Sequence, residues 1–371
     1  MMKSMFKSIW IMLLVLTSLY MANNHASEEV DIYQVSMPVT DQTPNTRSKA
    51  IEQGLNKVLI RASGLDSVLG NQYISDNISK ARTFIQKFSY QVYHPIQPLS
   101  DDKLSENSPI TPWELVIDFE PGSVQRLLSE AGLPVWGKRR PVVLVWIAEQ
   151  EGLDRKILSS DSDSAKLLTA LSQDRGIPFS LPLMDLEDST QIEMTDIWGR
   201  FSAPVEQASK RYAADVVVLG RVYSQGSNQW QADWQFVMNK DGSKKRAGWD
   251  QTAPSRTKIY QQLMSELGRK LCSQYCVMPT LSDEAEMRIS ISELQNFQQA
   301  MQAEQYLQSL LPVRAVNIEI LSVDRVIFKL HLVSREEDVL EAISLDTALK
   351  NLPNYDNIGA EKTLYNFSWV K

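Results

Sequence analysis

Residues 142–147 read Val-Val-Leu-Val-Trp-Ile, and residues 215–219 read Asp-Val-Val-Val-Leu. Continuous apolar runs of this length are typical of strands that are covered on both faces of a sheet. Helical patterns surround the two runs at 164–175, 204–212 and 255–272, and a further strand is expected at 177–184. The alternation of strands and helices predicts α/β layers around a central sheet.

An antiparallel extension is expected beyond the second apolar run. Strand-like segments lie at 222–224, 229–239 and 245–251, and Asp241-Gly242 has the residues of a hairpin turn. These segments and the α/β layers define a predicted middle domain over residues 138–280. It begins with the basic run Lys138-Arg139-Arg140, which we expect, like the run at 244–246, to be solvated surface.

The preceding residues 27–137 predict a smaller α+β domain. Apolar residues recur at helical spacing from Arg47 and stop at Gly64, where a C-terminal glycine is expected. Residues 113–120 alternate between apolar and polar, as in a half-buried strand. A strand at 30–39 and helices at 76–86 and 121–131 complete the pattern.

Residues 281–371 predict a third domain. A strand, a helix, two strands, a helix and a strand follow in this order at 287–291, 293–311, 313–321, 323–333, 337–349 and 363–370. This β-α-β-β-α-β order is that of a ferredoxin-like sandwich. The sequence therefore predicts a multi-domain protein of mixed α/β and α+β class.

Residues 1–26 have the pattern of a cleavable signal peptide. Lys3 and Lys7 precede an apolar run over 9–22, and the small residue Ala26 offers a cleavage point. The run is shorter than the roughly 20 apolar residues of a membrane span, which makes an uncleaved anchor the weaker alternative. No later run reaches that length, so we expect a soluble, exported chain without an integral membrane segment.

The composition indicates a folded, acidic protein. Hydrophobic residues make up 43% of the chain, and the formal net charge of −7 becomes −9 once the two lysines of residues 1–26 are removed. Such a charge repels phosphate backbones, so nucleic acid is not an expected partner. His94 and His331 have no nucleophile motif beside them, and no metal-binding or nucleotide-binding motif is found, so we expect no cofactor.

Cys272 and Cys276 are the two cysteines of the chain. In an oxidising compartment, a pair at this helical spacing predicts a disulfide near the end of the last helix of the middle domain. A redox-active pair is the functional alternative, although its usual spacing is C-x-x-C. A zinc site would need two further ligands, and none lies nearby in the sequence.

Two groups of carboxylates are candidates for chemistry. Asp118 and Glu120 share one face of a predicted strand, at a separation that would suit paired acid and base groups. Asp185, Glu187 and Asp188 follow another predicted strand, where α/β proteins often bind ligands. A divalent cation is one interpretation of this second cluster, and a solvated loop is the other.

Trp230 and Trp234 lie on one face of the predicted strand 229–239, and the opposite face is polar. The simpler interpretation is the inner face of the sheet packed on the helix at 255–272. The functional alternative is an aromatic platform for a glycan or peptide.

Four segments together resemble a family of exported proteins of Gram-negative bacteria, domain of unknown function 2066. They are Arg47–Gly64, Gly132–Trp146, Ile177–Asp188 and Ala208–Val222. This resemblance implies a location in the periplasm and no particular activity. The middle region, and especially residues 213–222 with the helix before them and the hairpin after them, is also similar at the level of the fold to the N-terminal domain of TolB, which implies protein docking rather than catalysis.

The sequence therefore favours a non-catalytic docking or accessory protein of the cell envelope. We expect the α/β layers to be its docking module and another envelope protein to be its partner. The alternative is a carboxylate-dependent enzyme, or a binding module, that acts on cell-wall glycan or peptide.

Overall fold

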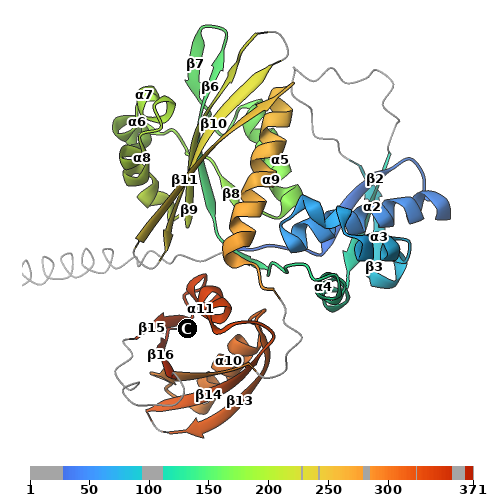
Figure 1. Cartoon of the computed structure of the whole chain (residues 1–371), viewed down its shortest axis with the longest axis vertical. Coiled ribbons are helices and arrows are strands. Elements are labelled where there is room, and N and C mark those ends of the chain that lie inside the picture. The colour runs from blue at the N-terminus through green and yellow to red at the C-terminus, as the bar shows by residue number, and fades with distance from the viewer. Residues whose placement is uncertain are drawn as a thin grey trace, which may run out of the picture.

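The computed structural model describes residues 28–93, 112–226, 229–240, 243–278, 285–322, 324–352 and 364–370. The expected signal peptide, His94 and the expected Asp241-Gly242 turn lie outside these residues. Within them, the strands form open sheets of three, six and five strands and one short two-stranded pair (Figure 1). Helices pack on each of the three larger sheets, which confirms the mixed α/β, multi-domain class.

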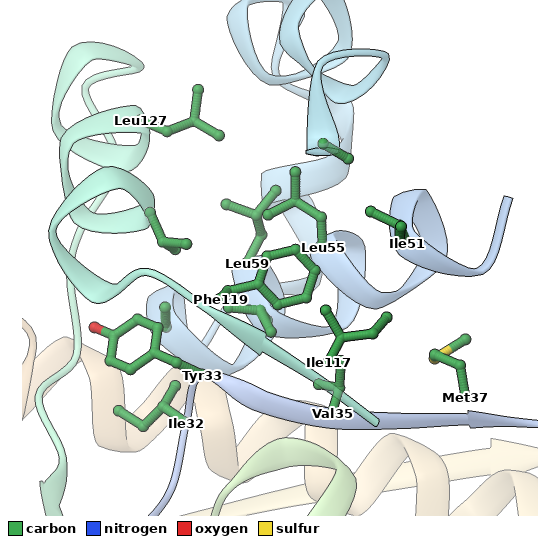
Figure 2. Packing of buried hydrophobic residues seen from close by; sticks show 14 of the residues in the cluster. Ile32, Tyr33, Val35, Met37, Ile51, Leu55, Leu59, Ile117, Phe119 and Leu127 are labelled. Carbon is green, nitrogen blue, oxygen red and sulfur yellow. The ribbon is translucent and has the colours of Figure 1, made fainter. Parts of the chain in front are cut away.

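The N-terminal region is built on the antiparallel sheet β2-β4-β3. Its strands are β2 (Gln34–Val39), β3 (Ile85–Val92) and β4 (Trp113–Phe119), and the helices α2 (Pro44–Ser63) and α4 (Pro121–Glu130) pack on one face. Thr43 caps the start of α2, and Gly64 ends it in the left-handed conformation. Figure 2 shows Leu55 and Leu59 of α2 against Phe119 of β4, in a core whose labelled residues come mainly from these elements.

The helix expected at 76–86 is not continuous. The chain instead forms η1 (Asp66–Gly70), α3 (Gln72–Ile78) and η2 (Ala81–Phe84) before β3 begins. The predicted end of the helix is too late in the chain. Residues from Ile85 onward pair with β4, and their backbone groups are then not free to form helical hydrogen bonds.

The middle sheet has the order β11-β10-β9-β6-β7. Its strands are β6 (Val143–Glu151), β7 (Asp154–Ile157), β9 (Val216–Ser224), β10 (Trp230–Lys240) and β11 (Ser243–Ala253), and β8 (Phe179–Ser180) pairs with the start of β6. β6 and β9 run parallel, whereas β9, β10 and β11 form an antiparallel meander. The apolar runs at 142–147 and 215–219 are therefore neighbours at the centre of this sheet.

Helices cover both faces of the middle sheet. α5 (Asp163–Arg175) and α9 (Arg256–Tyr275) pack on one face, and α6 (Leu186–Gln191), α7 (Met194–Trp198) and α8 (Ser202–Ser209) pack on the other (Figure 1). Alternate residues of β6 enter different cores, since Val145 faces α9 and Trp146 faces α8. Burial on both sides is the reason why β6 is apolar at each position from Val143 to Ala148.

Two expectations for this region are wrong in detail. The strand expected at 177–184 is reduced to the two residues of β8. The acidic segment after it, expected to be a loop, forms α6 and α7. Asp185 caps α6 with its side chain, which lets a polar sequence begin a short helix.

The C-terminal sheet has the order β13-β14-β12-β16-β15. Its elements are β12 (Glu286–Ser292), α10 (Phe297–Gln308), β13 (Val313–Leu321), β14 (Arg325–Leu332), α11 (Glu336–Ser344), β15 (Leu349–Asn351) and β16 (Leu364–Trp369). The first four strands in this order, β13-β14-β12-β16, match the strand order of a ferredoxin-like sheet. β16 nevertheless runs parallel to β12, because the extra strand β15 turns the chain once more before β16.

The junction between the N-terminal and middle regions is built around Arg140. The side chain is fully buried, so the expectation of solvated surface is wrong here. Its guanidinium donates to the carbonyl oxygens of Arg61 at 2.6 Å and Gly176 at 2.8 Å, near the C-terminal ends of α2 and α5, and lies over the Trp136 ring. Burial lowers the pKa of Arg140 to about 9, which leaves it charged at neutral pH. The exact domain boundaries at 137/138 and 280/281 stay a prediction.

Candidate functional site

The acidic cluster after β8 is closed by a cation of the same chain. Arg211 donates two hydrogen bonds of 2.7 Å to Asp185 and one of 3.2 Å to Asp188, and it lies 3.5 Å from Glu187. These Arg211 hydrogen bonds hold the pKa of the Asp185 carboxyl well below its usual range. Tyr212 donates to Asp188, and the pKa of Tyr212 rises to about 12, first through burial and then through that hydrogen bond.

The same cluster has a structural task. Asp188 is buried and also accepts the Met184 amide at 2.9 Å, while Asp185 accepts the Asp188 amide at the start of α6. Across the described ranges, no group of three or more histidine, cysteine or acidic residues is arranged to hold a metal ion. The geometry therefore favours an anchor for α6 over a cation site.

Asp118 and Glu120 have separate partners within the chain. Asp118 accepts a hydrogen bond of 2.7 Å from Gln34 and lies 3.3 Å from the Lys87 amine. Glu120 caps α4, since it accepts the amides of Gly122 at 3.0 Å and Ser123 at 2.5 Å. Hydrogen bonds from Ser123 and Gly122 lower the pKa of Glu120. An ionised helix cap is poorly suited to act as a general acid.

The two tryptophans of β10 lie in the sheet's inner face. Trp234 is fully buried, donates to Gln251 at 2.8 Å and packs in the same core as α9. Trp230 is half-buried at the rim of that core, with the Arg256 guanidinium 5.4 Å from its ring centre. A platform for a glycan needs both rings exposed, and Trp234 is not.

Cys272 and Cys276 are joined by a disulfide at the end of α9. The Cys272 sulfur lies 3.0 Å from the Ser63 carbonyl oxygen, at the end of α2. Beside it, Gly64 and Gly268 allow the two helices to touch, because a Cβ on Gly268 would lie 2.8 Å from the Gly64 carbonyl oxygen. The disulfide thus belongs to the junction of α2 with α9.

His331 is a surface histidine of β14. Its Nε2 lies 3.1 Å from the Asn317 side-chain amide, and its Nδ1 lies 3.7 Å from Glu286. Neither of these two partners is a serine or cysteine nucleophile.

Sequence reasoning missed a buried ionic cluster at the carboxyl end of β6. Glu149 is only 2% exposed, accepts a hydrogen bond from Tyr260 and lies 3.5 Å from Arg256. Burial, followed by the nearby Glu149 charge, raises the pKa of Tyr260. The signal for this cluster was a glutamate directly after the buried apolar residues 143–148.

The N-terminal sheet carries an uncovered apolar surface, which we call the β3 stripe. It consists of Phe88, Tyr90 and Val92 of β3 and Trp113 of β4, and Val92 lies opposite Trp113 in the strand register. Phe88 is 47% exposed, Val92 59% and Trp113 36%. Their neighbours Leu115 and Ile117 on β4 are fully buried, so the stripe continues the core face of the sheet beyond the covering helices.

A cavity of about 400 Å³ lies between the N-terminal region, the end of α9 and the C-terminal region. Arg139 lines it and is engaged there by Asp346, by Glu29 at 3.6 Å and by the Tyr306 ring at 5.0 Å, so it is not the solvated residue that we expected. The lining mixes the cations Lys138 and Arg139 with three carboxylates. This mixture favours no single ligand charge.

Comparison with known proteins adds a family match for part of the chain. Residues 26–137 match the model of a Domain of unknown function (DUF8605). This model bears a different name from the family that the four sequence segments resemble, and it does not reach the segment compared with TolB. No curated protein matches the chain.

One similar solved structure is described as "Crystal structure of uncharacterized protein". It is 9% identical, covers 36% of this chain and 93% of its own, and has a TM-score of 0.17. A likeness at this level carries no argument about function. In the part of the chain that the structure describes, no helix is both long and apolar enough to cross a membrane.

Proposed function

We propose that this protein is a non-catalytic docking or accessory factor of the bacterial cell envelope, exported to the periplasm, and that the β3 stripe contacts its partner. The observation that carries the proposal is the exposure of Phe88, Val92 and Trp113 on one continuous sheet face. Contiguous exposed apolar surface of this kind commonly marks a protein contact. The four segments that resemble exported proteins of unknown function support the envelope location.

The proposed docking surface lies on the N-terminal sheet and not on the α/β layers that the sequence favoured. Both faces of the middle sheet are covered by helices, whereas the N-terminal sheet keeps part of its core face open. The enzyme alternative loses support because Asp118, Glu120 and the Asp185 cluster are each engaged by side chains or amides of the chain itself.

Photo-crosslinking in intact cells tests this proposal. A photoreactive amino acid at Val92 should give a discrete adduct with one envelope protein, in the fraction that osmotic shock releases or in the membrane fraction. The matched control is Leu153, which is 99% exposed at the β6–β7 turn and should give no such adduct. The replacement Phe88→Ser should remove the adduct from Val92.

Equal adducts from Val92 and Leu153, or an adduct that survives Phe88→Ser, would count against docking through the stripe. Retention of the whole chain in the cytoplasm would count against the envelope location.

A further inference from the structure

A basic groove lies beside the β3 stripe. It has a volume of about 410 Å³, and its lining includes Arg47, Ile51, Arg82, Ile85, Lys87 and Phe88. The residues come from α2, from η2 and from β3. The Arg47 guanidinium lies 5.3 Å from the centre of the Phe88 ring, which joins the groove to the stripe.

The charge of the groove contrasts with that of the chain. The protein carries a formal net charge of −7, yet three cations and no carboxylate line this groove. Lys87 is partly neutralised by Asp118 at 3.3 Å. Within the described residues, neither Arg47 nor Arg82 has a carboxylate partner among the ion pairs. Two guanidinium groups are therefore available to a negatively charged ligand.

The groove is lined in part by β3, which is an edge strand within the described residues. β3 is the last strand in the order β2-β4-β3, so within the described chain its outer edge has no paired strand. An open edge presents amide and carbonyl groups that a further extended segment can pair with. With eight residues, β3 is long enough to pair with a peptide of similar length.

We propose that the groove binds an extended, acidic segment of a partner protein, which adds to the edge of β3 as a fourth strand. This inference rests on the proposed docking function and names the chemistry of the partner. Carboxylates of the segment bind Arg47 and Arg82, since guanidinium groups match carboxylate geometry. Apolar side chains of the same segment cover Tyr90 and Val92.

The arginines and the apolar stripe together favour a peptide over a small anion or a membrane surface. A small anion would use the arginines but would leave the apolar stripe and the strand edge unused. An anionic membrane would use the cations and aromatic rings but would not need the backbone groups of β3. Only an acidic strand uses the charge, the apolar face and the edge together.

The test uses the mature full-length chain and fluorescently labelled eight-residue peptides between Gly-Ser ends. In these peptides serine occupies every second position, and the other four positions are two glutamates followed by two valines, or the reverse order, so that both residue types lie on one face of the added strand. Fluorescence anisotropy should show binding at least tenfold tighter than for the matched glutamine–valine peptide, and the affinity should fall as salt is raised. The double variant Arg47→Glu, Arg82→Glu should lose at least tenfold in affinity. The control variant Lys156→Glu, an exposed cation of β7, should bind as the parent does.

A peptide whose alternate backbone amides are methylated tests strand addition, and its affinity should fall at least tenfold. Circular dichroism of each variant checks that the fold is retained. Equal binding of the glutamate and glutamine peptides, or unchanged binding by the double variant, would overturn the proposal. Binding of phosphatidylglycerol vesicles in place of the peptide, lost in the double variant, would overturn it in favour of a lipid surface.

A concentration-dependent dimer that the double variant abolishes would overturn the proposal in favour of a second copy of this chain. A failure of this proposal can be distinguished from a failure of the proposed docking function. If the adduct from Val92 persists while the acidic peptide does not bind, only the partner chemistry is wrong. If the adduct also fails, the docking function is wrong.

Discussion

Glu149 is buried although an ionised carboxylate is costly to remove from water. Its partners Arg256 and Tyr260 belong to the first turns of α9. In α/β folds, the carboxyl end of a parallel strand beside helix N-termini is where ligand anions commonly bind. Here the chain's own carboxylate lies in that position, which argues against a ligand site there.

Replacing Glu149 should therefore destabilise the fold. Glu149→Ala removes the carboxylate that faces the buried Arg256, and the expected loss in the free energy of unfolding is about 3–5 kcal/mol. Urea unfolding followed by tryptophan fluorescence measures it. The double replacement Glu149→Leu, Arg256→Met should recover most of the loss, because no buried charge then lacks its partner. A loss below about 1 kcal/mol in Glu149→Ala would show that the cluster is not a coupled ionic unit.

At the scale of elements, the pairing of β9 with β10 depends on a glycine. Gly220 lies opposite Trp234 in the strand register, and both belong to the side of the sheet that faces α9. A Cβ on Gly220 would lie 2.1 Å from Cε3 of the Trp234 ring. The large buried ring therefore fits only because its neighbour has no side chain.

Gly220→Ala should force Trp234 or the strand to move, and overpacking of this kind costs about 1–3 kcal/mol. Thermal unfolding of the variant should begin at a lower temperature, with a change in near-ultraviolet circular dichroism from Trp234. Gly248→Ala on β11 is the matched control, because a Cβ there has its nearest heavy atom at 3.5 Å. Equal melting temperatures for the two variants would contradict this account.

At the scale of the molecule, Arg140 ties the N-terminal and middle regions together. Its donors reach carbonyl oxygens near the ends of α2 and α5, and cations are favoured at helix C-termini. Val135 and Val277 add a backbone bridge at the same junction. The two regions should therefore unfold as one cooperative unit.

Arg140→Met should break this unit. Each buried carbonyl group left without a donor costs about 1–3 kcal/mol, so the loss in unfolding free energy should be about 3 kcal/mol or more. Urea unfolding should separate into two transitions, and limited proteolysis should cut near residue 138. Lys138→Met, which changes an exposed neighbour, is the control and should unfold as the parent does. A single unshifted transition in Arg140→Met would refute the linkage.

Much of the fold was predictable because burial leaves a periodic pattern in the sequence. The two central strands, the long helices α2 and α9 and the order of the C-terminal elements follow from apolar spacing. Short elements were missed, since α6, α7, β7 and β15 are stabilised by capping and by pairing with distant segments. The β3 stripe was missed for a related reason: its exposure depends on where the helices that cover the sheet end.

The sequence by itself determined the class of the fold, the acidic charge and the absence of familiar catalytic motifs, because composition and spacing are local properties. Only the tertiary structure decided which polar groups are already satisfied. Arg211 comes from a different helical segment than the Asp185 cluster it closes, and Arg140 lies far in sequence from the Arg61 carbonyl that it binds. Partners of this kind are set by packing. Among the described residues, packing also leaves the outer edge of β3 without a paired strand.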